Sequence, residues 1–111
     1  MKIIIAGGRS YIPNTRHEDI IIDILVNNNC TEVVSGGCRG ADKFGENISN
    51  ELRIPVKIFK ANWALQGPMA GPIRNRSMAA YADGCILLPG GKGTANMKKM
   101  AEEFFFKNMG D

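Results

Sequence analysis

The chain has 111 residues, of which 44% are hydrophobic and 23% charged, and its formal net charge is +3. This size and balance predict one globular domain over residues 1–111 and exclude a disordered chain. No apolar run approaches the ~18 residues that span a bilayer, and Met1–Ala6 is too short for a secretory signal. We therefore expect a cytoplasmic protein with no membrane partner.

The inventory of cysteine and histidine predicts no metal site. Cys30, Cys38 and Cys85 form no C-x-x-C pair, and His17 is the single histidine. Neither a zinc site nor a disulfide framework fits this set. The same inventory argues against a Ser-His-Asp or Cys-His nucleophile. We expect reduced thiols, as is usual in a reducing compartment.

Short apolar runs alternate along the chain with segments of helical periodicity. In chain order, the sequence predicts a strand at Ile3–Ala6, a helix at Glu18–Asn27, a strand at Val33–Ser35, a helix at Ala41–Leu52, a strand at Val56–Phe59, an irregular loop at Ala61–Gly71, a helix at Pro72–Ala82, a strand at Cys85–Leu88 and a helix at Thr94–Lys107, with Gly110 as its stop signal. Such alternation predicts an α/β fold, a Rossmann-like three-layer α/β/α domain with a small parallel sheet of about four strands.

Three of the four predicted strands end in glycines. The clusters are Gly7 and Gly8; Gly36, Gly37 and Gly40; and Gly90, Gly91 and Gly93. Because the carboxyl ends of parallel strands meet at one edge of a sheet, we expect these glycines to gather on one rim. That rim is the predicted binding site.

The segment Pro89–Thr94 is the strongest local signal. Its glycines let the backbone approach a ligand closely, and the start of the following helix favours an anion. Lys92 adds a positive charge, and Thr94 is able to donate to an anion or to cap the helix. A tight turn without a ligand is the alternative. The spacing fits neither a Walker loop nor G-x-G-x-x-G.

Two further segments place basic side chains beside glycines. In Ser35–Asp42, Arg39 is suited to hold a phosphate or to pair with Asp42, and Asp42 in a first helical turn is also explained by the helix dipole alone. Cys38 has no base beside it in this pattern. In Gly71–Arg76, Arg74 and Asn75 fall at a predicted helix start, and Arg74 and Arg76 cannot share one face. Gly7-Gly8-Arg9 is the weakest of these signals.

Taken together, these motifs resemble the SLOG superfamily of nucleotide-binding proteins, and within it the small YspA-like family of bacteria and phages. The resemblance rests on Gly7-Gly8-Arg9, Ser35-Gly36-Gly37-Cys38-Arg39-Gly40-Ala41-Asp42, Trp63, Gly71-Pro72-Ile73-Arg74-Asn75 and Pro89-Gly90-Gly91-Lys92-Gly93-Thr94, which occur in the order that the family uses. It spans nearly the whole chain and implies binding of a nucleotide or nucleotide-derived ligand, with no certain cofactor.

An enzymatic alternative comes from the Lonely-guy phosphoribohydrolases, which cleave the N-glycosidic bond of nucleoside monophosphates. Their motif P-G-G-x-G-T-x-x-E is matched here except that Met97 stands at the Glu position. Arg74, nine residues before Asp83, matches their catalytic Arg. A methionine cannot act as the carboxylate of such a reaction. We therefore expect a binding module rather than an enzyme.

A third reading is binding of single-stranded DNA, because the S-G-x-x-R-G-x-D loop and the R-N-R segment also resemble DNA-processing protein A. Trp63 or Tyr11 would then stack a base. The small net charge and 7% aromatic content favour this reading least. Separately, Phe104–Phe106 cannot all face one core, and the fourth strand would be an uncovered edge, so a homodimer through the last helices is predicted.

Overall fold

The computed structural model describes residues 1–107, and the stop signal predicted at Gly110 lies outside them. The strands are β1 (Lys2–Ala6), β2 (Glu32–Ser35), β3 (Val56–Ile58) and β4 (Gly84–Leu87). The helices are α1 (Thr15–Asn27), α2 (Ala41–Glu51), α3 (Trp63–Gln66), α4 (Ala70–Tyr81) and α5 (Lys92–Lys107), with a 3-10 turn, η1 (Gly67–Met69), between α3 and α4. In this part of the chain, no helix is both long and apolar enough to cross a membrane.

The four strands form one parallel sheet in the order β3-β2-β1-β4. From β1 the chain proceeds outward through β2 to β3, and it then returns to place β4 on the other side of β1. The point where the order reverses therefore lies between β1 and β4, where open α/β sheets bind their ligands. The predicted α/β fold with a four-stranded parallel sheet is confirmed.

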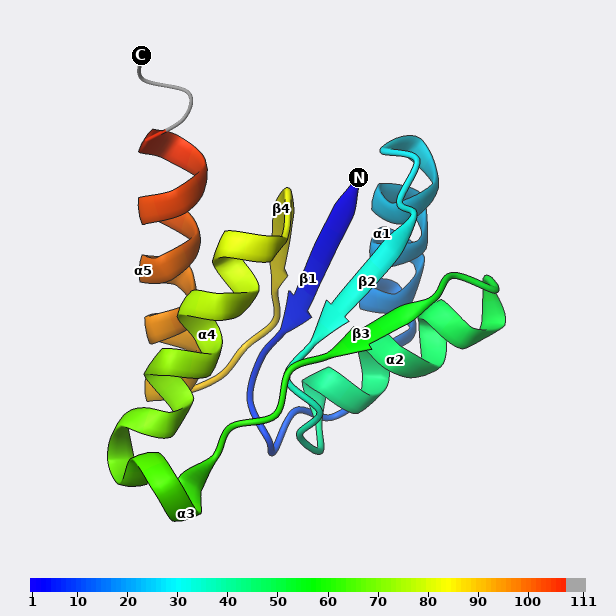
Figure 1. The fold of residues 1–111 in the computed structure, drawn as a ribbon. Helices are drawn as coiled ribbons and strands as arrows, with labels where there is room; N and C mark the ends of the chain where they lie inside the picture. The colour runs from blue at the N-terminus through cyan, green and yellow to red at the C-terminus, as the bar shows by residue number, and fades with distance from the viewer. Residues whose placement is uncertain (108–111) are drawn as a thin grey trace.

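Helices cover both faces of the sheet and complete three layers (Figure 1). Ile3 and Ile5 of β1 pack with residues of α1 and α2. Ile4 and Ala6 point to the opposite face and pack with residues of α4 and α5. Successive side chains of a strand alternate between faces, so a strand covered on both sides reads as the continuous apolar run seen in the sequence.

Several predicted boundaries are corrected. Helix α1 begins three residues before Glu18, because the Asn14 side chain caps it by accepting from the His17 N–H at 3.1 Å. Helix α4 begins at Ala70 rather than at Pro72. Pro72 is tolerated as its third residue because the N–H groups of the first turn have no partner within the helix. Arg74 therefore lies in the second turn of α4 and not at its start.

The segment between β3 and α4 is also more regular than predicted. The irregular loop expected over Ala61–Gly71 contains α3, η1 and the first residues of α4. The Asn62 side chain caps α3 by accepting from the Leu65 N–H at 3.1 Å. Its short length, with Gly67 and Pro68 following, is what concealed this helix in the sequence pattern.

The chain's last helix begins at Lys92, two residues before the predicted Thr94. Phe104 and Phe105 pack against the core that lies between the sheet and the helices α4 and α5. The Arg76 guanidinium carbon lies 5.2 Å from the centroid of the Phe104 ring. β4 is an edge strand of the described sheet, as expected. The homodimer inferred from that edge and from Phe104–Phe106 stays a prediction.

Candidate functional site

A cavity of about 390 Å³ opens at the carboxyl edge of the sheet, where β1 and β4 diverge. Its walls come from every glycine cluster that the sequence placed on this rim. The predicted residues that line it are Gly7, Gly8, Arg9, Gly36, Asp42, Trp63, Arg74, Asn75, Gly91, Gly93 and Thr94. We call this space the rim cavity. Its volume lies within the range of small-molecule sites.

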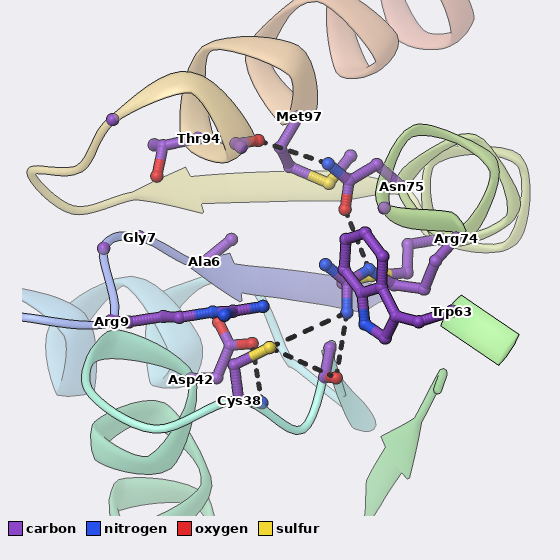
Figure 2. A pocket seen from close by; sticks show the side chains of 16 residues that line it. Ala6, Gly7, Arg9, Cys38, Asp42, Trp63, Arg74, Asn75, Thr94 and Met97 are labelled. Atoms are coloured by element: carbon purple, nitrogen blue, oxygen red, sulfur yellow. Dashed lines mark hydrogen bonds between the residues drawn. The ribbon is translucent and has the colours of Figure 1, made fainter. Parts of the chain in front are cut away.

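Arg74 reaches the rim cavity from the second turn of α4 (Figure 2). Its Nη1 donates to the Gly36 carbonyl oxygen at 3.0 Å, and its Nε donates to the Asn75 Oδ1 at 3.0 Å. Among the described residues the one ion pair is Lys43–Glu46, so Arg74 has no carboxylate within 4.0 Å there. The guanidinium is thus held in place by neutral oxygens and keeps its charge for an anion.

Asn75 ties Arg74 to the start of α5. This buried amide donates from Nδ2 to the Gly93 carbonyl oxygen at 3.2 Å and to the Asn96 Oδ1 at 3.0 Å. Because its Oδ1 accepts from Arg74, all of the amide is engaged within the protein. The ligand contact predicted for Asn75 stays a prediction; the residue lines the rim cavity, and its hydrogen bonds connect Arg74 to α5.

Gly36 is enclosed between the two charged side chains of the site. An added Cβ would lie 2.7 Å from the Arg74 Nη1 and 2.9 Å from the Asp42 Oδ2. A side chain at this position would displace one of these two groups, so a glycine here follows from the packing of Arg74 and Asp42.

Asp42 is the one carboxylate among the described residues that line the rim cavity, and its side chain is buried. Its Oδ2 accepts the Cys38 N–H at 3.1 Å, which holds the β2–α2 loop against the start of α2. Burial raises the pKa of Asp42, while the Cys38 hydrogen bond and the charge of Arg74 act to lower it.

The opposite wall is the β4–α5 loop with the first turn of α5. Ala95 N–H donates to the Gly91 carbonyl oxygen, so the amides of Lys92, Gly93 and Thr94 precede the first intrahelical hydrogen bond. An added Cβ on Gly91 or Gly93 would meet no atom within 4 Å. These amides and the helix dipole favour a phosphate or carboxylate at this wall.

Trp63 stands at the cavity mouth with half of its surface exposed. Its ring packs over Gly71, where an added Cβ would lie 3.2 Å from the Trp63 Cη2. Gly71 thus allows the indole to lie against the start of α4. The ring combines an apolar face with the access that stacking on a planar ligand requires.

The remaining predicted residues lie outside the rim cavity. Lys92 is exposed at the first position of α5. Gly90 packs against Thr94 and the Gly8 backbone, and Gly37 is exposed with φ 73°. Arg39 and Gly40 line a second cavity on the other side of the Gly40–Gly8 contact.

Five residues line the rim cavity that were not predicted as ligand contacts. They are Ala6, Cys38, Gly71, Met78 and Met97. Ala6, Met78 and Met97 are buried core residues whose ends also form the cavity floor, so their patterns indicate only packing. Cys38 lies in the β2–α2 loop and Gly71 in the first turn of α4, and both fall within the glycine-bearing motifs of the sequence, which were the available signal.

In the described residues, no group of three or more His, Cys, Asp or Glu side chains is arranged to hold a metal ion. The groups that line the rim cavity are the guanidinium groups of Arg9 and Arg74, backbone amides, the Trp63 ring and the buried Asp42 carboxylate. Comparison with protein-family models, curated proteins and solved structures gives no match to this chain.

Proposed function

We propose that this chain binds a nucleotide or nucleotide-derived ligand in the rim cavity and acts as a binding module. The observation that carries the proposal is the convergence of the Arg74 guanidinium and the first-turn amides of α5 on one space at the switch point of the sheet. Both groups are suited to a phosphate. The resemblance to the SLOG superfamily supports the same ligand class.

The rest of the cavity suits the remainder of a nucleotide. Trp63 offers an exposed ring face on which a base would stack, and Asp42 and the Gly36 backbone offer acceptors for hydroxyl groups. The apolar floor of Met78 and Met97 excludes water beneath the ligand. Two arginines beside many backbone groups favour recognition of a phosphate in this cavity.

The enzymatic alternative, cleavage of the N-glycosidic bond, needs a carboxylate that acts on the sugar. Met97 occupies the motif position for it and is 1% exposed. Asp42, the carboxylate that lines the cavity, lies at the start of α2 and not at the α5 position of the motif, and one of its oxygens accepts the Cys38 N–H. We therefore propose no hydrolysis. A sensitive assay for free base from the four nucleoside monophosphates, with measurable turnover by the wild type, would overturn this part of the proposal.

Calorimetric titration tests the binding proposal. The probes are the four nucleoside monophosphates, their unphosphorylated nucleosides and inorganic phosphate. We expect saturable binding of at least one monophosphate, and loss of that affinity in Arg74→Ala. Arg76→Ala is the matched control, because Arg76 lies on the same helix against Phe104 and does not line the rim cavity. An equal loss in both variants, or no binding by any probe, would contradict the proposal.

A further inference from the structure

A second cavity of about 400 Å³ lies beside the rim cavity and shares Arg9 with it. Its walls include Tyr11, Arg39, Lys43 and Phe44. The nucleotide site proposed above does not use any of these four residues. Two cavities that share one cationic side chain raise the question whether a single ligand occupies both.

The β1–α1 and β2–α2 loops touch beside Arg9, which lines both cavities. The Ala41 N–H donates to the Gly8 carbonyl oxygen at 3.1 Å, and a Cβ on Gly40 would overlap the Gly8 and Arg9 backbone. The β1–α1 and β2–α2 loops therefore touch through their backbones. Arg9 is exposed, and Figure 2 shows its side chain extending along the rim cavity toward Asp42 and Cys38.

The second cavity is cationic. Arg9, Arg39 and Lys43 line it, and no Asp or Glu is among its described lining residues. Lys43 pairs with Glu46 at 3.2 Å, which is the one ion pair among the side chains that the structure describes, those of residues 1–105. Arg9 and Arg39 thus have no carboxylate within 4.0 Å in this part of the chain. Two such guanidinium groups at adjoining cavities favour an anion that reaches from one cavity to the other.

The second cavity also has an aromatic wall with a fixed orientation. The Tyr11 hydroxyl is hydrogen bonded to the His17 Nδ1 at 2.7 Å, and its ring lies 5.3 Å from the Phe44 ring. The ring is stacked against His17 on one side at 5.9 Å. A held aromatic ring beside unpaired cations repeats the combination of Trp63 and Arg74 in the rim cavity. Each cavity therefore combines an aromatic side chain with cations, groups that contact bases and phosphates in nucleotide-binding proteins.

We propose that the ligand is a dinucleotide, two nucleoside units joined through phosphate. The linkage is a pyrophosphate: the first nucleoside and its phosphate occupy the rim cavity at Arg74 and α5, the second phosphate lies at Arg9, and the second nucleoside lies between Tyr11 and Arg39. This inference rests on the proposed function, because it extends the same ligand beyond the rim cavity. It predicts that the second nucleoside adds affinity, since binding of the first unit makes the second event intramolecular.

The test compares mononucleotides with dinucleotides on the full chain by calorimetry. The probes are the four 5′-nucleoside monophosphates, the corresponding symmetric dinucleoside pyrophosphates, and an eight-nucleotide single-stranded DNA. We expect a dinucleotide to bind at least about tenfold more tightly than its mononucleotide. Equal affinities would overturn the inference and leave the proposed function standing. Tighter binding of the DNA than of every dinucleotide would overturn it in favour of a nucleic-acid strand.

Arg39→Ala locates the second unit. Arg39 is exposed and lines only the second cavity, so we expect its removal to weaken the dinucleotide by roughly tenfold and the mononucleotide by less than about twofold. Lys99→Ala is the control, because it removes one charge from an exposed position of α5 that lines neither cavity. Equal effects of Arg39→Ala on both ligands, or none on either, would overturn the inference. If no nucleotide binds at all, the proposed function fails with it.

Discussion

The β2–α2 loop and the β4–α5 loop are both rich in glycine and both follow a parallel strand, yet they use glycine differently. In the β2–α2 loop, Gly36 is enclosed by Arg74 and Asp42, and Gly40 has φ 78° and touches the β1–α1 loop. The fold requires glycine at position 40, and the placement of Arg74 and Asp42 requires it at position 36. Any side chain would displace either backbone or the charged groups of the site.

In the β4–α5 loop, Gly91 and Gly93 are exposed, and an added Cβ would meet no atom within 4 Å. Neither residue has a positive φ. Nothing in the folded chain therefore requires glycine at these positions. The β2–α2 loop thus builds the cavity, whereas the chain after β4 is closely packed only at Gly90 and leaves the backbone of Gly91 and Gly93 open to a ligand. Substitutions of glycine in the β2–α2 loop should therefore lower the free energy of unfolding, whereas substitutions at Gly91 or Gly93 should leave it nearly unchanged, so that effects on ligand binding can be measured separately.

The largest expected effect is on stability, in Gly40→Ala. Alanine would have to adopt a backbone conformation that L residues rarely enter and would overlap the Gly8 and Arg9 backbone. We expect a loss of about 3 kcal/mol or more in the free energy of unfolding. Urea unfolding measures it. Gly91→Ala is the matched control and should change stability by less than about 0.5 kcal/mol. A Gly40→Ala protein as stable as the control would show that the loops do not touch as described.

Arg74→Ala should give the largest loss of ligand affinity. A hydrogen-bonded charge is worth about 1.5–3 kcal/mol, or roughly 10–100-fold in Kd. Lys92→Ala should cost about twofold or less, because Lys92 is an exposed point charge that does not line the cavity. The loss of affinity in Arg74→Ala should appear for the monophosphate and not for the unphosphorylated nucleoside, and titration with both ligands measures this. Equal losses in the two variants would mean that Arg74 does not hold the phosphate.

Gly93→Ala should separate binding from folding. The residue lies in the first turn of α5 with open space around it, so alanine should preserve the free energy of unfolding or raise it by up to about 1 kcal/mol. Ligand affinity should fall nonetheless, because the methyl group would stand between the first-turn amides and the phosphate. Thermal unfolding and calorimetry on the same sample measure both. Unchanged affinity would show that the ligand does not approach this backbone.

The smallest effect concerns pH and Asp42→Asn. Burial raises the pKa of Asp42 in the folded chain, so the folded state binds the proton more tightly than the unfolded chain. The ionised carboxylate therefore costs stability at neutral pH, and this cost disappears as the pH falls through the folded pKa toward about 3.9, the unfolded value. Asparagine keeps an acceptor for the Cys38 N–H.

We expect Asp42→Asn to be at least as stable as the wild type at pH 7, with its advantage shrinking toward pH 4. Urea midpoints across this range provide the measurement. An advantage that grows on acidification would mean that the Cys38 hydrogen bond and the charge of Arg74 outweigh desolvation of the carboxylate.

Most of the fold could be predicted from local patterns. Strands such as Ile3–Ala6 are buried on both faces and read as continuous apolar runs, and α2 shows a regular apolar stripe. Boundaries were less accessible. The apolar stripe of α1 begins after Glu18 and does not reveal the cap at Asn14. Proline is common at a helix start and so predicts Pro72 as the first residue of α4, but it is tolerated throughout the first turn, and the helix begins at Ala70.

The site was predictable only as a set of loops. Parallel topology brings strand ends together, so the glycine clusters had to meet at one rim. The pairing of Arg74 with the Gly36 carbonyl joins residues 38 positions apart, and no local pattern contains it. The cavity floor could not be predicted for another reason. Met78 and Met97 have the helical spacing of core residues and do belong to the core, so the sequence pattern does not show that they also line the cavity.

Trp63 has a practical consequence for work on this protein. It is the only tryptophan in the chain, and it is half exposed at the mouth of the rim cavity. All indole fluorescence therefore originates at the place where a ligand is proposed to enter. Stacking of a base on the ring would change the emission directly. The unmodified protein thus contains its own optical reporter, and substitutions elsewhere in the site leave that reporter intact.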